Sequence, residues 1–391
     1  MTAAPKVLQA GEARLWLGID LYAWMRFLVR NRFAIGPAYW PMAALISACS
    51  VPNTVMKVLT DALFGGPVAR RPMRQAPLFI VGHWRTGTTL LHELLICDPQ
   101  HTYATFCQCL FPHHFLLTDR IYPRLFRTLM PRQRPMDAME VGWDRPQEDE
   151  LALALLGAPS PYVTMAFPNH PPQDQDALDV EDLPTRYRLQ WKRIFSRFVR
   201  ELTFRDPRRL ILKSPTHSFR IKTLLELYPD ARFVHIVRDP YAVFPSTVNL
   251  WKKMYTHGLQ TPRFNGLEEH VFQTFVRLYA KLEEGKRLIP PHRFHEMHYE
   301  ELIRDPEGQI RLLYERLQLD RIEEALPPMR QYLARHADYQ TNHYPALTPE
   351  SRAEITQRWG PIIERYGYSK DQAAFKQNGE AKRRATTCQI S

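Results

Sequence analysis

The chain has 391 residues, of which 45% are hydrophobic, 12% aromatic and 24% charged. These values are typical of a globular protein and exclude a disordered or fibrous chain. The 52 Lys and Arg residues outnumber the 41 Asp and Glu residues, and the net charge of +11 favours an anionic partner. The few cysteines form neither a zinc pattern nor an even disulfide set, so we expect a reducing, cytoplasmic compartment. They are Cys49, Cys97, Cys107, Cys109 and Cys388.

Residues 1–75 are expected to form an N-terminal helical segment outside the catalytic domain. Residues 33–56 carry no charged side chain, and this length could span a bilayer. Pro37, Pro41 and Pro52 interrupt the stretch, and each removes a helical hydrogen bond that hydrocarbon cannot replace. Three arrangements stay open: helices packed on the catalytic domain, a true membrane span, or an interfacial membrane attachment. The attachment would be flanked by Arg26, Arg30, Arg32 and Lys57.

From residue 76 onward, short apolar runs alternate with helical patterns. This alternation predicts an α/β domain over 76–368, with a mainly parallel sheet covered by helices. Residues 157–184 contain six prolines and are expected to form an irregular loop or lid, and 369–391 a loose basic tail. Strands are predicted at 78–81, 210–212, 233–237 and 294–298. Helices are predicted from about Thr88, over 187–204, 221–228 and 241–254, and over most of 306–366.

The segment from Gly82 to Thr89 joins the first predicted strand to its helix. Its spacing matches the G-x-x-x-x-G of a phosphate loop, in which backbone N–H groups and a helix N-terminus bind an anion. Thr88 stands where a nucleoside triphosphatase has its lysine, which argues against ATP or GTP hydrolysis. A cation is present instead at Arg85, inside the loop. The alternative is an ordinary strand-to-helix turn.

A second motif, Arg238-Asp239-Pro240, ends the strand predicted at 233–237 and is followed by Ser246. If the next helix begins at Pro240, a favoured first position for proline, Ser246 lies less than two turns into it. Ser246 and Arg238 could then share one anion. Guanidinium and hydroxyl donors suit a phosphate monoester, although such a turn is often only structural.

Together these motifs resemble the signature of the sulfotransferase family that uses 3′-phosphoadenylyl sulfate (PAPS). The resemblance rests on the loop Arg85 to Thr89, on Lys213-Ser214-Pro215, and on Arg238 with Ser246, and it covers roughly residues 76–368. The chain is similar to bacterial sulfotransferase-family proteins and, more distantly, to the tyrosylprotein sulfotransferases. The resemblance implies a P-loop-like fold and transfer of a sulfuryl group from PAPS to a hydroxyl or amine of an unidentified acceptor. The nucleotide product would be adenosine 3′,5′-bisphosphate.

The resemblance also implies roles for individual residues. Lys213 would neutralise the sulfuryl and leaving phosphate oxygens, and Arg238 with Ser246 would hold the 3′-phosphate. Tyr299 is similar to a tyrosine near the donor's adenine, with core packing as its alternative. Sulfuryl transfer depends mostly on positioning and positive charge, so we expect no protein-bound metal. The 5′-phosphosulfate would be held by Arg85, Thr86, Gly87, Thr88 and Thr89, with Arg85 also catalytic.

The sequence leaves the general base open. Tyrosylprotein sulfotransferases carry a catalytic glutamate 21 residues after the loop arginine, where this chain has Phe106, so specificity for peptide tyrosines is in doubt. One candidate is His217, four residues after Lys213, because an imidazole suits proton removal near neutral pH. The other is the cluster Glu148-Asp149-Glu150, in which Glu150 is preferred to Glu148, although both candidates have structural alternatives. His83 and His92 are further candidates.

Two other classes of function stay open. A P-loop kinase or nucleoside triphosphatase is the first, and a basic nucleic-acid or membrane-binding module is the second. The arginines at 186, 188, 193, 197 and 200 motivate the module but are more typical of a solvated helix face. We expect a nucleotide donor, an unknown small-molecule, lipid or glycan acceptor, and no nucleic acid. The uncharged N-terminal stretch suggests an apolar acceptor and peripheral membrane contact, and the oligomeric state is not predicted.

Overall fold

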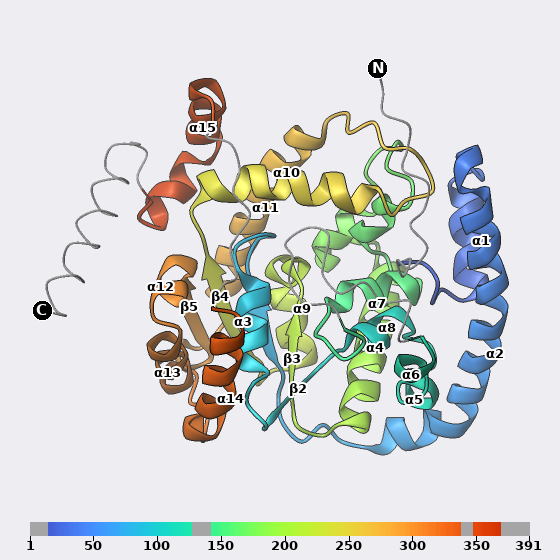
Figure 1. Ribbon diagram of the computed structural model, residues 1–391, viewed down its shortest axis with the longest axis horizontal. Helices are drawn as coiled ribbons and strands as arrows, with labels where there is room; N and C mark the ends of the chain where they lie inside the picture. The colour runs from blue at the N-terminus through green and yellow to red at the C-terminus, as the bar shows by residue number, and fades with distance from the viewer. Residues whose placement is uncertain (1–14, 127–141, 338–346, 369–391) are drawn as a thin grey trace, which may run out of the picture.

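The computed structural model describes residues 15–126, 142–337 and 347–368. The basic tail predicted at 369–391 therefore lies outside the described residues. Five strands form one parallel sheet in the order β2-β3-β1-β4-β5. Helices surround this sheet (Figure 1). The strands are β1 (Leu78–Val81), β2 (His101–Tyr103), β3 (Arg209–Lys213), β4 (Arg232–Val237) and β5 (Phe294–His298).

All four predicted strands are confirmed within one residue at each end. The strand β2 was not predicted, because its three residues include His101 and Thr102 and form no apolar run. It pairs with β3, with His101 opposite Arg209 and Tyr103 opposite Ile211. The predicted α/β class with a mainly parallel sheet is confirmed.

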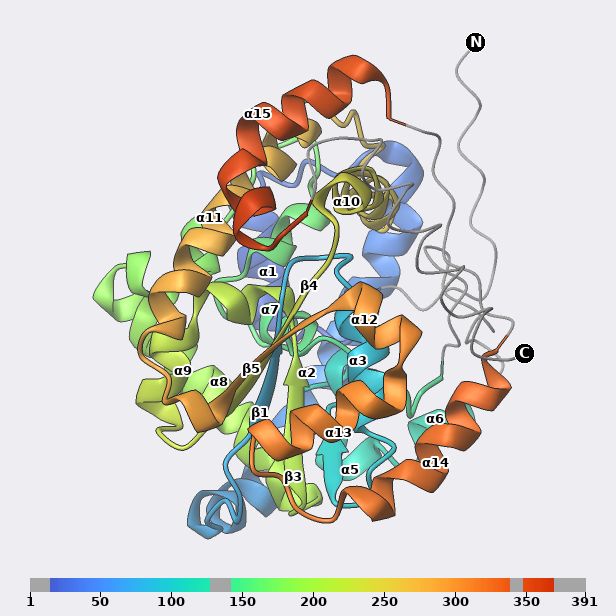
Figure 2. The same ribbon diagram turned by 90° about the vertical axis from the view of Figure 1, so that its left-hand side faces the viewer.

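Side chains of the central strands alternate between two hydrophobic cores. In β1, Phe79 and Val81 belong to one core, whereas Leu78 and Ile80 belong to the other. The sheet is therefore covered on both faces, as the continuous apolar runs predicted. Figure 2 shows the helices of one face: α3 (Thr88–Leu95), α12 (Tyr299–Arg304), α13 (Pro306–Arg316) and α14 (Ile322–Arg335). The opposite face carries α8 (Thr185–Arg205), α9 (Ile221–Leu227) and α11 (Leu267–Lys286).

Further helices surround these layers. They are α4 (Phe106–Leu110), α5 (Phe115–Thr118), α6 (Tyr122–Leu125), α7 (Asp149–Leu155), α10 (Pro240–Tyr255) and α15 (Pro349–Arg365). The predicted helices over 187–204, 221–228 and 241–254 are confirmed by α8, α9 and α10. Residues 157–184 contain only short 3₁₀ turns, as expected, but Met165, Ala166 and Phe167 are fully buried. Part of this loop is therefore packed into the core.

At the N-terminal end, α1 (Leu21–Arg30) packs on the long α2 (Trp40–Arg70), at the right of Figure 1. The helix α2 begins after Pro37, which lies in a separate 3₁₀ turn, and continues through Pro52 and Pro67, so these two interior prolines do not break it. An interior proline costs about 3 kcal/mol, but tertiary packing supplies most helical stability in proteins. In α2 the buried side, with Ile46 and Ser50 fully buried, packs on the rest of the chain.

Candidate active site

The loop between β1 and α3 has the tight backbone expected of an anion-binding turn. Gly82 has φ of +152°, and a Cβ there would lie 2.7 Å from the Ile236 carbonyl oxygen. Gly87 has φ of +99°, and its Cβ would lie 2.3 Å from Cδ2 of Tyr299. The hydroxyl of Thr86 donates to the carbonyl of His83 at 2.7 Å across the loop. Glycine is therefore required at both positions, and the loop places the N-terminus of α3 at the carboxyl end of the sheet.

The Arg238 motif lies directly against this loop. Nη1 of Arg238 donates to the carbonyl oxygen of Arg85 at 3.1 Å, and its guanidinium lies 4.3 Å from the Tyr299 ring centroid. Nε of Arg85 donates to Oγ of Ser246 at 2.8 Å. The structure thus brings Arg85, Arg238, Ser246 and Tyr299 together beside Gly87. The helix α10 begins at Pro240, as its sequence predicted.

Lys213 joins the same region because β3 is the neighbour of β1. Its Cα is the register partner of Ile80, one residue from the end of β1. The Nζ of Lys213 donates to Oε1 of Glu148 at 2.8 Å. The side chain of Lys213 is only 3% exposed, whereas that of Glu148 is 18% exposed. A buried ammonium needs such a partner, since an unpaired buried charge is costly.

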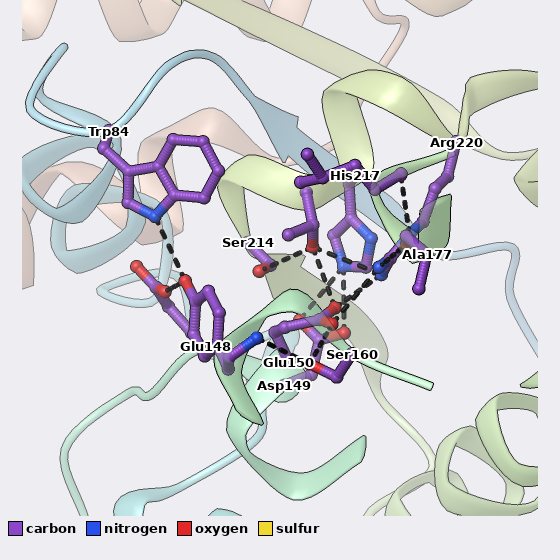
Figure 3. A network of polar contacts seen from close by, with 12 residues as sticks. Trp84, Glu148, Asp149, Glu150, Ser160, Ala177, Ser214, His217 and Arg220 are labelled. Atoms are coloured by element: carbon purple, nitrogen blue, oxygen red, sulfur yellow. Dashed lines mark hydrogen bonds and ion pairs between the residues drawn. The ribbon is translucent and has the colours of Figure 1, made fainter. Parts of the chain in front are cut away.

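Glu148 precedes α7 and is connected to the phosphate loop through two aromatic side chains. The hydroxyl of Tyr162 donates to Oε2 of Glu148, and Nε1 of Trp84 donates to Oη of Tyr162 at 3.1 Å. Burial and the nearby Glu148 carboxylate raise the pKa of Tyr162 well above its usual value, so the phenol stays protonated. Figure 3 shows Trp84 and Glu148 on one side of this polar network.

His217 lies apart from any solvent-facing surface. It is fully buried, and its Nε2 lies 2.9 Å from Oδ2 of Asp149, which is also fully buried (Figure 3). The imidazole packs edge-on against Phe79, with ring centroids 5.2 Å apart. An acceptor hydroxyl cannot reach a side chain in this position without displacing the core. The placement argues against His217 as the general base.

Glu150 is likewise enclosed. Its carboxylate forms an ion pair with Arg220, and both side chains are fully buried (Figure 3). Ser160 donates to Oε1 at 2.6 Å and Thr216 donates to Oε2 at 2.9 Å. The guanidinium of Arg220 also donates to the carbonyl of Ala177, which ties the 157–184 segment to this group. Glu150 therefore has a structural environment, and of the acidic cluster Glu148 alone has an exposed fraction.

The remaining histidine candidates are also buried. Burial lowers the pKa of His83 to about 4 and that of His92 well below its usual value, with the charge of Lys213 adding to the effect on His92. Both imidazoles are therefore neutral near pH 7 and have little tendency to accept a proton. Phe106, which stands where the tyrosylprotein enzymes have a glutamate, packs on Trp143 with ring centroids 5.7 Å apart.

No group of three or more His, Cys, Asp and Glu side chains in residues 15–126, 142–337 and 347–368 is arranged to hold a metal ion. The cysteines within the same ranges, Cys49, Cys97, Cys107 and Cys109, are free thiols. Burial raises the pKa of the Cys107 thiol to about 12. Cys107 and Cys109 are buried side chains of the core.

Sequence reasoning missed two residues of this site. Tyr162 lies in a proline-rich segment without periodicity, so nothing local indicated its contact with Glu148. Trp84 lies inside the loop that the sequence singled out, and a large aromatic there was the available signal. The preference for Glu148 over Glu150 needed the structure, because the two side chains differ in burial: that of Glu148 is 18% exposed and that of Glu150 is fully buried.

Comparison with known proteins gives one consistent result. Residues 77–324 match the profile described as "Sulfotransferase family". The chain is 52% identical over 359 residues to the omega-hydroxy-beta-dihydromenaquinone-9 sulfotransferase Stf3 of Mycobacterium bovis and of Mycobacterium tuberculosis, covering 92% of this chain and 92% of each relative.

Two solved structures have a similar fold. The sulfotransferase STF9 from Mycobacterium avium has a TM-score of 0.63 and 22% identity, covering 90% of this chain and 93% of that one. The sulfotransferase STF1 from Mycobacterium tuberculosis H37Rv has a TM-score of 0.56 and 18% identity, covering 88% and 94%. At these identities the two structures bear on the fold alone.

Proposed function

The chain belongs to the sulfotransferase family and is an enzyme of sulfuryl transfer, and from this premise we propose its donor, its catalytic residues and the chemical class of its acceptor. The donor is PAPS and the products are adenosine 3′,5′-bisphosphate and a sulfate ester. Because the chain belongs to this family, sulfuryl transfer is its function in place of the two alternatives, a kinase or nucleoside triphosphatase and a basic binding module. The fold is the P-loop-like α/β fold that the sequence predicted.

The contact between the loop and the Arg238 motif is the observation that carries the proposed donor. PAPS has two anionic groups, a phosphosulfate and a 3′-phosphate, and Arg85 and Arg238 supply two guanidinium groups. The Arg238 guanidinium donates to the backbone carbonyl of Arg85, and the Arg85 guanidinium donates to Ser246. The backbone N–H groups of 85–89 and the start of α3 suit the phosphosulfate. Ser246 and Arg238 suit the 3′-phosphate, and the Tyr299 ring beside them suits the adenine side of the nucleotide.

We assign the general base to Glu148 in place of His217 and Glu150. Glu148 contacts Lys213, the cation expected beside the transferring group, and is the carboxylate of its cluster with a solvent-exposed fraction. Each carboxylate oxygen has a second lone pair, so Glu148 can accept the acceptor's hydroxyl proton while Tyr162 and Lys213 keep it oriented. Tyr162 is a positioning residue, since it acts through Glu148.

Arg85 and Lys213 supply positive charge where negative charge develops. Sulfuryl transfer, like phosphoryl transfer, spreads charge over equatorial oxygens while the nucleophile and leaving group lie in line. Fixed cations at such a site stabilise the transition state without reorganisation. The low exposure of Lys213 strengthens this effect, because charges interact more strongly away from water.

The proposed acceptor is a hydroxyl group on an apolar lipid, such as the hydroxylated end of an isoprenoid quinol. Support comes from the relatives at 52% identity, whose name states that they sulfate an omega-hydroxylated dihydromenaquinone. A lipid acceptor resides in a membrane, so the proposed location is the cytoplasm with peripheral membrane contact. A peptide tyrosine is a less suitable acceptor, because this chain has Phe106 where the tyrosylprotein sulfotransferases have their catalytic glutamate.

Radiolabelled PAPS tests the donor and the acceptor together. Purified enzyme is incubated with labelled PAPS and an omega-hydroxylated isoprenoid quinol, and the lipid is extracted and analysed by mass spectrometry. We expect label and one added sulfuryl group in the lipid, and none with the Arg85→Ala variant. Label that enters only glycans or peptides of a cell extract would overturn the lipid acceptor. Failure of adenosine 3′,5′-bisphosphate to bind would overturn the donor.

A further inference from the structure

Large apolar side chains are exposed mainly on one part of the molecule. Of eighteen large hydrophobic side chains exposed within the described residues, twelve belong to α1, α2 and their connection. Isolated exposed apolar residues are ordinary, but a contiguous group marks an interaction site. We name these twelve the α1–α2 face: Leu21, Tyr22, Met25, Val29, Phe33, Trp40, Leu45, Val51, Val55, Val58, Leu59 and Leu63.

The exposed side of α2 carries no charge over six turns of helix. Between Trp40 and Leu63 the sequence has only two charged residues, Lys57 and Asp61. Both are half-buried and engaged by neighbouring elements: Lys57 pairs with Asp20 at 2.5 Å, and Asp61 pairs with Arg197 of α8. The exposed large residues beside them, Val55, Val58 and Leu59, are apolar.

The opposite side of α2 is fixed to the protein by polar contacts. Nδ2 of Asn53 donates to the carbonyl oxygens of Leu17 and Ile19 at 2.7 and 3.0 Å, and its Oδ1 lies 3.2 Å from Nε2 of His114. By length and composition the helix Pro37–Arg70 could cross a membrane. A helix tied along one side to a soluble domain cannot be surrounded by lipid, so the geometry excludes a span and leaves contact through the exposed side.

Arginines flank the α1–α2 face. Residues 20–75 contain seven Lys and Arg residues and two acids, Asp20 and Asp61, and of the seven cations Lys57 pairs with Asp20 and Arg30 with Asp174. The exposed Arg26 and Arg32 lie at the α1 end, and Arg70, Arg71 and Arg74 lie at the far end of α2. An apolar surface with cations at its margins complements a bilayer with anionic headgroups, whose attraction acts within a Debye length.

We propose that the α1–α2 face seats the enzyme on the surface of an anionic lipid bilayer, with α2 lying in the plane of the headgroups and its apolar side chains inserted below them. This inference rests on α1 and α2 alone and holds whatever the acceptor is. The partner of the α1–α2 face is lipid and not a second copy of the chain.

Seated in this way, the α1–α2 face is connected to the candidate base through α7. Nε2 of His113 donates to the Leu155 carbonyl at the end of α7 and lies 3.6 Å from Asp20, the N-cap of α1. Glu148 precedes the other end of α7, which has seven residues. The helix α7, about 10 Å long, therefore connects Glu148 to His113 and Asp20, which lie behind the α1–α2 face. This consequence rests on the proposed function, since it matters only if the acceptor is a lipid hydroxyl and Glu148 is the base.

Vesicle flotation of the full chain, without donor or acceptor, tests the inference independently of catalysis. The probes are vesicles of phosphatidylcholine alone and of phosphatidylcholine with phosphatidylglycerol. The face variant combines Val51→Glu, Val55→Glu and Val58→Glu at residues that are 50%, 55% and 62% exposed. The control adds the same charge elsewhere on the surface, through Val276→Glu, Leu288→Glu and Ile303→Glu, at 43%, 53% and 52% exposure.

We expect wild type and control to bind the phosphatidylglycerol vesicles and the face variant to bind at least about tenfold more weakly. Retained binding of adenosine 3′,5′-bisphosphate shows that each variant is folded. Absence of wild-type binding to both vesicles, or equal weakening by both variants, would overturn the proposal. So would sedimentation velocity showing a wild-type dimer that the face variant dissociates, because the face would then join two copies.

Discussion

Replacing Glu148 by glutamine keeps the shape of the side chain and removes its charge and its ability to accept a proton. The Glu148 carboxylate accepts from Lys213 at 2.8 Å and from the Tyr162 hydroxyl. A positioned general base contributes about 10²–10⁴-fold to a rate. We therefore expect kcat of Glu148→Gln to fall by that factor, which corresponds to about 3–5 kcal/mol of transition-state stabilisation.

The same substitution should have a limited effect on stability. Lys213 loses an anionic partner, but the glutamine amide oxygen still accepts one hydrogen bond. A hydrogen bond to a charged group contributes about 1.5–3 kcal/mol, so the free energy of unfolding should fall by about 1–2 kcal/mol. Binding of adenosine 3′,5′-bisphosphate should change little, because Arg238 and Ser246, which are assigned to the 3′-phosphate, are held at the loop by their contacts with Arg85.

Glu150→Gln is the matched control, two residues away in the same cluster. Glu150 and Arg220 are both fully buried, and breaking such a pair typically costs about 3–5 kcal/mol of stability. Glu150→Gln should therefore lower the urea midpoint strongly and leave kcat per folded molecule nearly unchanged. His217→Asn should behave in the same way, because its partner Asp149 is also buried.

The assay combines turnover of labelled PAPS, urea unfolding and calorimetric titration of adenosine 3′,5′-bisphosphate for each variant. Turnover of Glu148→Gln within about threefold of wild type at saturating substrates would refute the base assignment. A large kcat loss per folded molecule in His217→Asn with Glu148→Gln active would return the role to the histidine.

Three further predictions concern the loop and its surroundings. Arg238→Ala should weaken binding of adenosine 3′,5′-bisphosphate by about 1–3 kcal/mol, and calorimetry showing undiminished affinity would contradict its role. Gly87→Ala should lower the free energy of unfolding by about 3 kcal/mol, because the added Cβ would lie 2.3 Å from Tyr299. The control Gly266→Ala has φ of +71° but no atom within 4 Å of the added Cβ, so it should cost about 1 kcal/mol. Equal losses in urea unfolding would disprove this reasoning. Burial lowers the pKa of His83 from 6.5 to about 4, so its contribution to stability is complete above pH 6.5 and is lost as the pH falls toward 4, by about 2 kcal/mol at pH 5. His83→Asn should reduce the difference between urea unfolding at pH 7 and pH 5 by that amount, and an unchanged difference would count against it.

Local sequence signals determined the central elements of the fold. The run Leu78–Val81 is apolar at every position because both faces of β1 are buried, and such a run is recognisable without the tertiary structure. The loop from Gly82 to Thr89 was equally recognisable, since a tight turn before a helix restricts which residues fit. Short β2 escaped prediction because pairing with β3, and not its own composition, makes it a strand.

In the candidate site, too, some residues were recognisable from the sequence and others only from tertiary contacts. Arg85, Arg238, Ser246 and Tyr299 were selected from the sequence, and the parallel sheet brings them together because the carboxyl ends of β1, β4 and β5 lie side by side. The choice among carboxylates depended on contacts distant in sequence. Glu148 meets Lys213 across 65 positions of the chain.

The amino-acid sequence by itself determined the sheet class, the loop with phosphate-loop spacing and the family resemblance, because each depends on residue types at short, fixed spacing. Only the tertiary structure decided that Glu150 and His217 are enclosed and that Glu148 is not, since burial is a property of the surrounding packing. The same holds for α2: its apolar composition fits a span or a surface helix equally. The polar contacts of Asn53 on one side determine which side of α2 is left exposed.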